Sequence, residues 1–401
     1  MSAVAFENVD IVFGSDPKRA LPLIDSGVSR SDILDQTGQV MGVAGASLQV
    51  QPGEIYVLMG LSGSGKSTLL RAVNRLNKVT RGRVLVAHEG KQVDVAACDA
   101  QTLRMLRSKR IAMVFQQFGL LPWRTVEDNV GFGLELRGVQ PAERQRVVAE
   151  KLDLVHLTPW AKKYAHELSG GMQQRVGLAR AFATDADILL MDEPFSALDP
   201  LIRSKLQDEL LQLQQRLKKT IIFVSHDLDE ALKIGTNIAI MQDARIVQAG
   251  APEDIVLKPA TDYVREFVAN VNPLSVLTAY NVMRDARDLE PAGDGWVWLD
   301  RRKTTRFKLD ADRRVTAAER DGAAARWLAC EEIGDHLDNA ANLVFWSRPT
   351  TPLRTVIHGM HRDAAPVAIF DPEDRFVGAV GVRDVLQAVL RRKPESGNGA
   401  G

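Results

Sequence analysis

The sequence predicts an α/β fold for most of the chain, followed by a smaller α+β region. Short apolar runs typical of buried strands alternate with longer helical patterns through the first two thirds. One such run, Ile55–Met59, passes through a glycine-rich loop into a helical pattern at Ser67–Leu76. Around residues 270–273 the composition changes, and tryptophan and arginine become frequent. We therefore expect a large domain over residues 1–272 and a second region over 273–392.

Composition narrows the functional classes. The chain has 51 basic and 51 acidic residues, so it lacks the net positive charge that would favour binding to nucleic acid. Apolar runs such as Ile188–Met191 are too short to cross a bilayer, and Glu7 and Asp10 interrupt any secretory signal. Cys98 and Cys330 lie far apart and indicate neither a disulfide framework nor a metal site. These features favour a protein of the reducing cytosol that reaches a membrane only through protein partners.

Strands are expected where apolar residues cluster between turn signals. Val4–Phe13 reads as the first strand, and residues 14–38 read as an insertion with an amphipathic helical stretch at Ile24–Leu34. Strands Val43–Val50 and Ile55–Met59 then lead into the glycine-rich loop. The later strand signals are Arg83–Val86, Ile111–Phe115, Ile188–Met191, Ile221–Val224, Ile238–Met241 and Arg245–Gln248.

A helical insert is expected between the strand that ends at Phe115 and the later strands. The pattern over residues 118–165 turns helical, in Val126–Leu136 and in the charged, periodic Pro141–Val155. Pro200–Leu217 follows as an amphipathic helix whose leucine stripe is expected to pack on the sheet.

The last part of the chain reads as strand, helix, strand, strand and helix. A turn at residues 371–374 separates the second and third of these strands. The five elements are Leu343–Trp346, Pro352–Met360, Ala365–Phe370, Arg375–Val380 and Val382–Leu390. The polar, glycine-rich end at residues 393–401 is expected to be disordered.

The glycine-rich loop, Gly60–Thr68, fits the pattern G-x-x-x-x-G-K-[ST] of a phosphate-binding loop. Its glycines let the backbone amides point inward at phosphate oxygens, and the following helix adds the positive end of its dipole. Lys66 is expected to reach the β- and γ-phosphates, and the Ser67 hydroxyl to hold Mg²⁺. The expected contacts of the nucleotide are Gly60, Ser62, Gly63, Ser64, Gly65, Lys66, Ser67 and Thr68. The chain is thus predicted to bind a nucleoside triphosphate.

Two further segments carry groups suited to the same ligand. Asp192 and Glu193 end an apolar strand, where Asp192 can bind Mg²⁺ through water and Glu193 can polarise an attacking water. Ser169 can cap the helix that follows it, and Gly170 and Gly171 leave bare amides there, which makes a second anion site. Taken alone, Asp192 and Glu193 could also mark an ordinary junction between a strand and a loop. Ser169–Gly171 could equally well be an ordinary capped junction between a loop and a helix.

Together these motifs resemble the ATP-binding subunit of an ABC transporter. In that family six elements follow in fixed order, and here they are Gly60–Thr68, Gln116, Leu168–Gln173, Asp192 with Glu193, Ser196–Asp199 and His226. Met172, which precedes Gln173 in the signature segment, departs from the simplest pattern. The resemblance implies a P-loop ATPase of the ABC type with a helical insert, and ATP and Mg²⁺ as its cofactors.

The resemblance also implies a role for each side chain at the phosphates. Glu193, His226 and Gln116 would be catalytic, with Glu193 as the general base and His226 in contact with the γ-phosphate and the attacking water. Gln116 would sense Mg²⁺ and the γ-phosphate and pass the state of the site to the helical insert. The metal would be held by Ser67, Gln116 and Asp192.

A homodimer follows from the same resemblance, because one subunit cannot bring all six elements to one phosphate group. In the family, two copies pair head to tail, and the signature of one closes over ATP bound by Lys66 of the other. Asp199 would sit at the boundary between the copies. The signature residues expected at ATP are Ser169, Gly170, Gly171 and Gln173. A monomer should bind ATP but barely hydrolyse it.

The family usually stacks an aromatic side chain on adenine just before the second strand. Simple spacing selects Thr37, which is not aromatic. If the insertion at residues 14–38 displaces the alignment, Phe13 becomes the stacking residue. Packing in the core is an equally good interpretation of Phe13.

Several segments closely resemble the ATPases that power uptake of glycine betaine, proline betaine and choline, and the leading segment is most like the choline subgroup. These segments are Val12–Pro17, Ile33–Gly38, Met59–Gly65, Ala197–Arg203 and Val224–Ala231. The resemblance implies two transmembrane permease subunits, an indirect link to an extracytoplasmic substrate-binding protein, and no nucleic-acid partner. The chain would be peripheral, at the cytoplasmic face of the inner membrane. A soluble ABC-type ATPase that is not coupled to transport is the alternative.

The C-terminal unit that ends in Phe376–Asp384 resembles a CBS (cystathionine β-synthase-type) module. Members of this importer group often carry two such modules as regulators, and the first, at about residues 276–335, would be degenerate. Adenosine-binding copies usually have Ser or Thr three residues before the Asp, and here that position is Gly381. A dimerisation or packing module without a ligand is an equally good interpretation.

Overall fold

The computed structural model describes residues 1–116, 119–196, 198–269, 271–272, 274, 276–332, 342–360 and 365–390. The chain divides into two compact units, residues 1–255 with 259–266, and residues 256–258 with 267 onward. This division falls shortly before the expected boundary at residue 272. Three predicted features lie outside the described residues: the start of the helical insert at 118, Ala197 of the Ser196–Asp199 segment, and the tail at 393–401.

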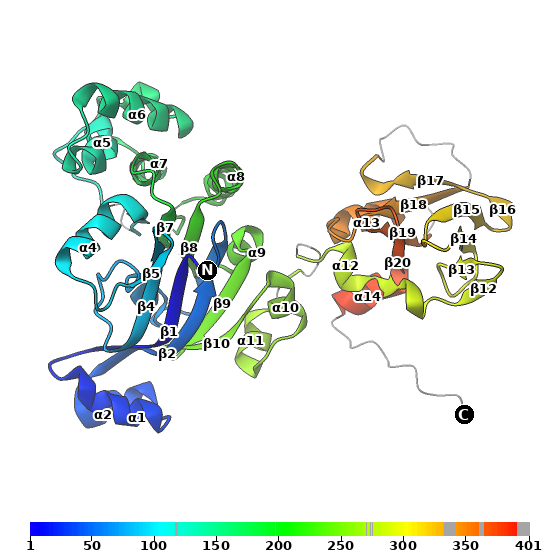
Figure 1. Ribbon diagram of the computed structural model, residues 1–401, viewed down its shortest axis with the longest axis horizontal. Helices are drawn as coiled ribbons and strands as arrows, with labels where there is room; N and C mark the ends of the chain where they lie inside the picture. Colours follow the sequence, from blue (N-terminus) through cyan, green and yellow to red (C-terminus); the bar gives the residue numbers. More distant parts are fainter. Residues whose placement is uncertain are drawn as a thin grey trace. The chain divides into compact units, whose positions relative to one another are not determined.

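The first unit contains two β-sheets, which Figure 1 shows in blue to green. Its strands are β1 Val4–Phe13, β2 Val40–Val50, β3 Ile55–Met59, β4 Arg81–His88, β5 Lys91–Asp94, β6 Ile111–Val114, β7 Ile188–Asp192, β8 Thr220–Ser225, β9 Asn237–Gln242 and β10 Arg245–Gly250. One sheet has the order β10-β9-β3-β8-β7-β6 and is parallel except for the pair β10 and β9. The other is antiparallel, with the order β2-β1-β4-β5. The predicted α/β fold is confirmed.

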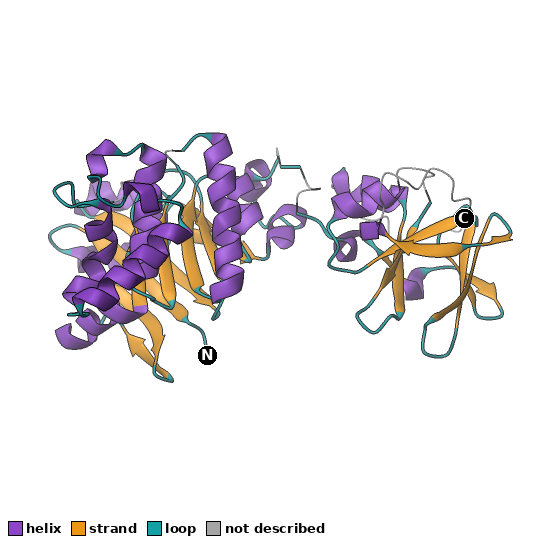
Figure 2. Ribbon diagram, turned by 90° about the horizontal axis from the view of Figure 1, so that it is seen from above, coloured by secondary structure: helices purple, strands orange, loops and turns teal. Residues whose placement is uncertain are grey.

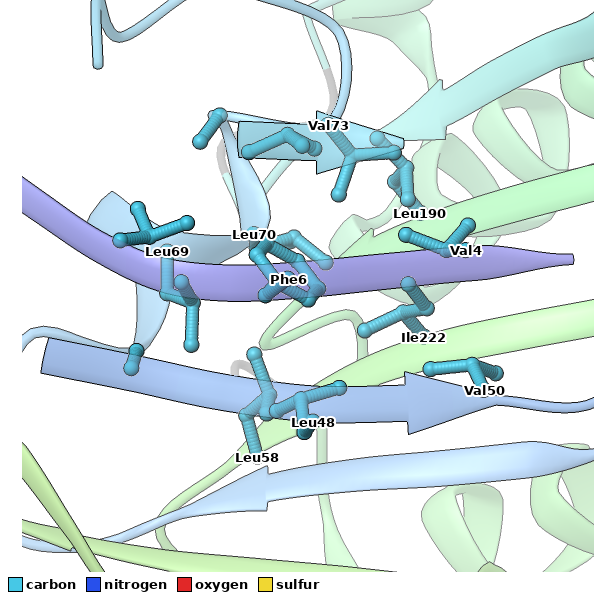
Figure 3. Close-up of a cluster of buried hydrophobic side chains, with 14 of the residues drawn as sticks. Val4, Phe6, Leu48, Val50, Leu58, Leu69, Leu70, Val73, Leu190 and Ile222 are labelled. Atoms are coloured by element: carbon cyan, nitrogen blue, oxygen red, sulfur yellow. The ribbon is translucent and has the colours of Figure 1, made fainter. Parts of the chain in front are cut away.

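A single large apolar cluster joins the two sheets of this unit. Phe6 of β1 and Leu48 of β2 meet Leu70, Leu190 and Ile222 in it, and Figure 3 shows the part of the cluster around Phe6. Strands β3, β7 and β8 are buried at every position, so they carry continuous apolar runs instead of an alternating pattern. Those runs are the reason the sequence revealed these strands.

Helices accompany the strands of the first unit, as Figure 2 shows in purple. They are α1 Leu21–Asp25, α2 Arg30–Thr37, α3 Lys66–Leu70, α4 Ala100–Met105, α5 Val126–Leu136, α6 Pro141–Leu154, α7 Gly170–Ala183, α8 Pro200–Leu217 and α9 Leu228–Ile234. Two more helices, α10 Pro252–Leu257 and α11 Asp262–Phe267, begin in the first unit and have their last residues in the second. Helices α5, α6 and α7 pack around a separate apolar core that includes Val130, Leu152 and Val176. This core gives the predicted helical insert its own support. Within the described ranges, no helix combines the length and the apolar character that crossing a bilayer requires.

Two helices differ from the sequence expectation. The amphipathic stretch at Ile24–Leu34 is divided between α1 and α2, because Gly27 takes a left-handed conformation with φ of 74° and Ser29 starts a new helix by capping it. The helix expected over Ser67–Leu76 ends early, at Leu70. Turns follow it as far as Arg75, whose backbone has a left-handed conformation with φ of 55°. Amphipathic spacing alone shows neither break.

The second unit holds two small sheets. Its strands are β11 Arg284–Asp285, β12 Pro291–Gly293, β13 Trp296–Trp298, β14 Thr305–Leu309, β15 Val315–Arg320, β16 Ala323–Ala324, β17 Arg326–Ala329, β18 Leu343–Ser347, β19 Val367–Phe370 and β20 Phe376–Val380. One sheet has the order β11-β20-β19-β18-β17, and the other, antiparallel, runs β12-β13-β14-β15-β16. The helices are α12 Ala279–Val282, α13 Leu353–Met360 and α14 Val382–Val389.

The two halves of this unit differ in how far they follow the sequence prediction. From β18 to α14 the order is strand, helix, strand, strand and helix, with bounds close to those expected. The expected first module, at about residues 276–335, contains the short helix α12 followed mainly by short antiparallel strands. Glycine-containing turns such as Asp294–Gly295 and Asp321–Gly322 explain why the strands there are short.

Candidate nucleotide-binding site

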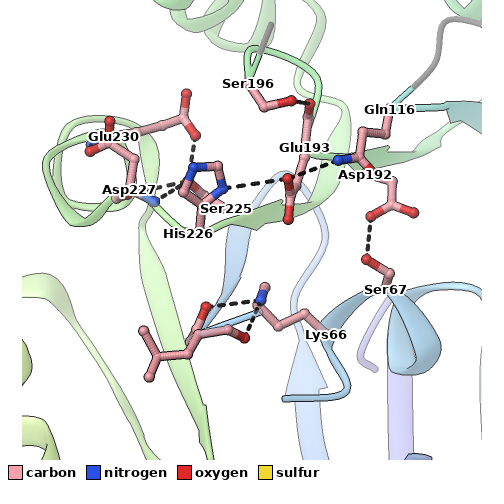
Figure 4. Close-up of polar contacts among 12 residues, drawn as sticks. Lys66, Ser67, Gln116, Asp192, Glu193, Ser196, Ser225, His226, Asp227 and Glu230 are labelled. Carbon is pink, nitrogen blue, oxygen red and sulfur yellow. Dashed lines mark hydrogen bonds and ion pairs between the residues drawn. The ribbon is translucent and has the colours of Figure 1, made fainter. Parts of the chain in front are cut away.

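The phosphate loop joins the carboxyl end of β3 to the start of α3. Lys66, the first residue of α3, is 4% exposed, and its Nζ donates hydrogen bonds of 2.8 Å to the carbonyl oxygens of Gly60 and Leu61 (Figure 4). Burial lowers the pKa of the Lys66 ammonium, while the charges of Glu193 and Asp192 act to raise it. A cation is therefore held inside the curl of the loop, next to two carboxylates.

Two glycines of the loop are required by close backbone approach. Gly60 has a φ of 145°, and a Cβ there would lie 2.2 Å from the carbonyl oxygen of Met241. Gly65 has a φ of 100°, and a Cβ there would lie 2.4 Å from the carbonyl oxygen of Gly42. Any side chain at either position would force the loop away from its neighbours β9 and β2.

Asp192, at the end of β7, contacts the residue after Lys66 from a strand that is separated from β3 by β8. It is fully buried, and its Oδ1 accepts a hydrogen bond of 2.6 Å from the Ser67 hydroxyl. Its Oδ2 pairs with Arg71, with distances of 3.0 Å to Nε and 2.8 Å to the nearer Nη. The buried carboxylate is thus compensated, as a charge inside a protein must be.

Glu193 forms the centre of a second group of side chains. Its Oε2 accepts a hydrogen bond of 3.1 Å from Gln116 Nε2 and lies 3.4 Å from His226 Nδ1 (Figure 4). Gln116 follows β6 and His226 follows β8, so the carboxyl ends of three strands contribute one side chain each. In parallel sheets this edge is where ligands bind.

The segment that carries His226 is held by a buried carboxylate. Glu230 of α9 is 8% exposed, and it accepts hydrogen bonds from Ser225 Oγ at 2.5 Å and from Gln207 Nε2 at 3.0 Å. Ser225 Oγ in turn accepts a hydrogen bond of 3.0 Å from the Asp227 amide. Burial raises the pKa of Glu230, against the effect of the two hydrogen bonds.

A cavity of about 590 Å³ unites these groups. Its lining residues are Phe13, Arg30, Val40, Gly42, Leu61, Ser62, Gly63, Gly65, Lys66, Ser67, Thr68, Gln116, Glu193 and His226. Phe13 is 41% exposed, and its ring lies over Gly42, where an added Cβ would be 2.7 Å from Phe13 Cε2. Thr37, the position selected by simple spacing, lies in α2 and is not part of this lining.

The signature residues lie elsewhere in the first unit. Ser169 caps α7 by accepting a weak hydrogen bond of 3.4 Å from the Met172 amide, and Gln173 Nε2 donates to the Leu168 carbonyl oxygen at 3.1 Å. Asp199 caps α8 by accepting from the Ile202 amide at 3.1 Å. Within the described part of the chain, the lining of the Lys66 cavity includes none of Ser169, Gly170, Gly171, Gln173 or Asp199.

The oxygen ligands present suit Mg²⁺. Ser67 Oγ and Asp192 Oδ1 are 2.6 Å apart beside the cavity, and magnesium in such sites takes one or two protein oxygens together with phosphates and waters. Among the described residues, no group of three or more His, Cys, Asp or Glu side chains could enclose a metal by itself. Both the pair of protein oxygens and the lack of a larger ligand cluster are consistent with a metal site whose coordination is completed by phosphate oxygens.

Sequence reasoning missed two cations at this site. Arg71 follows Ser67 by four residues, so helical spacing could have placed it beside Asp192. Arg30 comes from the insertion, and its Nη1 donates a hydrogen bond of 2.5 Å to the carbonyl oxygen of Gly63. Nothing in the spacing of the sequence indicates the second contact, which depends on the path of the insertion.

Two protein-family models match the chain. The model described as ABC transporter matches residues 43–196. The model described as AAA domain, putative AbiEii toxin, Type IV TA system, matches residues 161–232. The first match includes the phosphate loop and Glu193, and the second includes Glu193 and His226.

Curated relatives align with the chain over much or nearly all of its length. The glycine betaine/proline betaine transport system ATP-binding protein ProV of Salmonella typhimurium is 42% identical, over 98% of this chain and 98% of that protein. The glycine betaine transport ATP-binding protein OpuAA of Bacillus subtilis is 42% identical, over 99% and 94%. The choline transport ATP-binding protein OpuBA of Bacillus subtilis is 39% identical, over 58% and 59%.

Solved structures match the fold as well. One is the dimeric structure of a post-hydrolysis state of an ATP-binding cassette bound to ADP and Pi. It is 29% identical with a TM-score of 0.53, and the match covers 62% of this chain and 98% of that one.

Proposed function

This chain belongs to the family of ATP-binding subunits of ABC transporters for glycine betaine and related quaternary amines, and we propose that its ATP hydrolysis powers import of such a solute. One observation carries the proposal. Lys66, Glu193 and His226 meet at one cavity in a chain that is 42% identical, over 98% of its length, to a glycine betaine/proline betaine transport protein. An ATPase unconnected with transport finds no support among these relatives.

Glycine betaine or proline betaine is the proposed solute. Two relatives named for glycine betaine align over 98% and 99% of the chain and two others over 69% and 71%, whereas the choline relative aligns over 58% of it. The family expected from the sequence is confirmed, but the choline subgroup expected from the leading segment gives the lesser match, so choline is the second candidate. A quaternary ammonium solute would be recognised by aromatic side chains of a separate binding protein.

The proposed reaction is hydrolysis of ATP to ADP and phosphate. Lys66 would exchange the carbonyl oxygens of Gly60 and Leu61 for β- and γ-phosphate oxygens. Glu193 would take a proton from a water molecule as its oxygen attacks the γ-phosphorus, while His226 and Gln116 hold that water and the phosphate. Mg²⁺ at Ser67 and Asp192 would neutralise phosphate charge.

The proposed working unit is a head-to-tail homodimer. Its basis is the position of the signature, which is absent from the lining of the Lys66 cavity in the described part of the subunit. A second copy would supply Ser169 and Gly171 to the γ-phosphate, through the capped N-terminus of α7. Two permease subunits at the cytoplasmic face of the membrane would receive the motion through the helical insert, and a substrate-binding protein would deliver the solute from outside.

A CBS-like regulatory role is proposed for the C-terminal region. Its support is the order of elements from β18 to α14. Asp384 already accepts hydrogen bonds from the Gly381 amide at 2.7 Å and from Arg284 Nε at 3.1 Å. Both bonds reach the same oxygen, Oδ2, and Gly381 offers no hydroxyl where adenosine-binding copies have Ser or Thr, so we propose regulation without a nucleotide bound at Asp384.

Transport by the reconstituted complex tests the proposed function. Proteoliposomes that contain the chain, its permease and its binding protein are loaded with ATP and given labelled glycine betaine, proline betaine or choline. ATP-dependent uptake of a betaine is expected, and Lys66→Ala should abolish it, since each lost charge-assisted hydrogen bond costs about 1.5–3 kcal/mol. The exposed Lys91 provides the control variant Lys91→Ala, which should transport normally.

Two results would contradict the proposals. Hydrolysis of ATP without uptake of any of the three solutes would contradict the proposal that the transported solute is one of these quaternary amines. A chain that ends at residue 272 tests the regulatory role in the same vesicles, and an unchanged response of uptake to ionic strength would leave the C-terminal region as structural.

A further inference from the structure

The insertion between β1 and β2 brings a cation to the nucleotide cavity. Arg30 is the first residue of α2, and its Nη1 donates a hydrogen bond of 2.5 Å to the Gly63 carbonyl oxygen in the phosphate loop. The Arg30 side chain also lines the cavity of about 590 Å³, together with Ser62 and Lys66. It belongs to none of the motifs that mark the ATPase.

The position of Arg30 is fixed by the packing of its helix. Ser29 caps α2 by accepting a hydrogen bond of 3.1 Å from the Asp32 amide. Ile33, one turn after Arg30, is fully buried in an apolar cluster with Ile24 and Met41. The insertion is therefore anchored to β2, and Arg30 is carried by a helix with a core of its own.

A second anchor ties the insertion to the antiparallel sheet. Arg81 of β4 pairs with Asp25 at the end of α1, at 2.6 Å, and with the buried Asp10 of β1, at 2.5 Å. Helix α1 is thereby held to β1, the strand that also carries Phe13 of the cavity lining. Because the insertion is held at both places, the guanidinium of Arg30 loses less conformational entropy when it binds an anion.

The guanidinium has donors to spare. It carries five N–H groups in a planar fork, and the bond to Gly63 uses one of them. A planar fork matches the oxygens of a phosphate, and the cavity beside it is the one in which the triphosphate would lie. Lys66 is buried inside the loop, and the partly exposed Arg30 adds a second positive charge to the lining of the same cavity.

We propose that Arg30 is a further nucleotide-binding residue that contacts the phosphate chain of ATP and links the insertion to occupancy of the site. The inference rests on the proposed function, in which this cavity binds ATP. Removing Arg30 should then weaken binding of ATP without changing the fold.

Three substitutions separate a contact to phosphate from simple support of the loop. Arg30→Lys keeps the charge, Arg30→Gln keeps a donor for the Gly63 carbonyl without the charge, and Arg30→Ala removes both. Binding of ATP with Mg²⁺ to the purified full chain is measured by calorimetry. We expect Ala and Gln to raise the Kd about tenfold, which corresponds to about 1.4 kcal/mol, and Lys to recover most of the loss. Arg19→Ala, an exposed arginine of the same insertion outside the cavity lining, should bind as the wild type does.

Hydrogen exchange gives a readout that loop support alone would not move. ATP should slow exchange of the α2 amides in the wild type and much less in Arg30→Ala. Wild-type affinity in Arg30→Gln and Arg30→Ala would overturn the inference, as would equal protection of α2 in both proteins. Lys66→Ala distinguishes failure of the inference from failure of the proposed function. If the Arg30 variants and Lys66→Ala all bind ATP normally, the proposed function fails along with the inference. If only the Arg30 variants bind normally, the inference fails alone.

Discussion

At the scale of single residues, the backbone of Glu193 is unusual. Its φ of 46° is left-handed, a conformation that a non-glycine residue adopts at a cost. The residue directly follows Asp192 at the end of β7, and its amide donates a hydrogen bond of 3.2 Å to the Val224 carbonyl oxygen. This turn of the backbone directs Glu193 toward Gln116 and His226 while Asp192 stays buried against Ser67. Strain of this kind collects at functional sites, which fits a catalytic role for Glu193.

The first prediction concerns Glu193 as general base. Glu193→Gln keeps the size of the side chain and a hydrogen-bonding group but cannot accept the proton from water. Turnover of ATP should fall by roughly 10²–10⁴ while ATP affinity stays unchanged. Steady-state hydrolysis and calorimetric binding measure the two quantities, and Glu89→Gln, in an exposed turn, is the control. Hydrolysis at the wild-type rate in Glu193→Gln would remove this residue from the mechanism.

Phe13 supplies the second prediction. Its ring lines the cavity over Gly42, and the Thr68 side chain lies on the same glycine, where an added Cβ would be 3.0 Å from Thr68 Cγ2. If adenine stacks on the ring, Phe13→Ala should weaken ATP binding by about 1–3 kcal/mol, and Phe13→Trp should retain it. Binding is measured by calorimetry and stability by thermal melting. A variant that loses stability but binds ATP normally would assign Phe13 to packing alone.

At the scale of elements, the start of α9 positions His226. Asp227 caps the helix by accepting from the Glu230 amide at 3.2 Å and pairs with Arg203 of α8 at 2.9 Å. Glu230 then bonds Ser225 at the end of β8. A strand, a cap and two helices thus hold the segment that presents His226, which by itself is an exposed side chain.

The buried Glu230 predicts a pH dependence of stability. Its pKa is raised above the usual 4.5 by burial, so the folded chain binds this proton more tightly than the unfolded chain. Stability should therefore fall as the pH rises from 4.5 through the raised pKa, and stay level above it. Glu230→Gln cannot ionise, so its melting temperature should fall less over that interval. Glu209→Gln is the control, and parallel curves for Glu230→Gln and the wild type would refute the assignment.

Local patterns predicted some elements better than others, for physical reasons. Strands β3, β7 and β8 were found because complete burial favours an unbroken apolar run, which polar residues interrupt only at the strand ends, as Asp192 does in β7. The insertion was found, but its helix was predicted as one piece, because amphipathic spacing does not reveal a cap at Ser29. Residues 291–324 carried too little periodicity to predict the antiparallel sheet that they form.

At the scale of the whole molecule, the two halves of the proposed composite site lie at different places in one subunit. Lys66 and Glu193 share a cavity whose lining, in the described residues, lacks the signature at the start of α7. Similarity to a dimeric ATP-binding cassette supports the pairing of two copies. Pairing would also explain why α7 packs in a separate helical core while its signature residues do not line the cavity of Lys66.

Mixed dimers test this arrangement. A Cβ added at Gly170 meets nothing within 4 Å, so Gly170→Asp should fold normally while its carboxylate repels phosphate across the interface. Neither Gly170→Asp nor Lys66→Ala should hydrolyse ATP alone. An equal mixture should regain up to about a quarter of wild-type activity, because half of the dimers are mixed and each has one intact site. If mixed dimers form and remain inactive, the head-to-tail arrangement is wrong.

The sequence by itself determined the α/β class, the phosphate loop and the order of motifs that led to the family. Those features are local: a loop that curls around phosphate needs glycines at fixed positions, and a buried strand needs an unbroken apolar run. Only the tertiary structure decided which distant segments reach the cavity. Phe13, and not Thr37, lies beside the loop because β1 and β2 pair with Phe13 opposite Val40, so the whole insertion projects from that hairpin. Arg30 returns to Gly63 because the insertion packs on its own apolar cluster, an outcome of folding that no spacing between residues records.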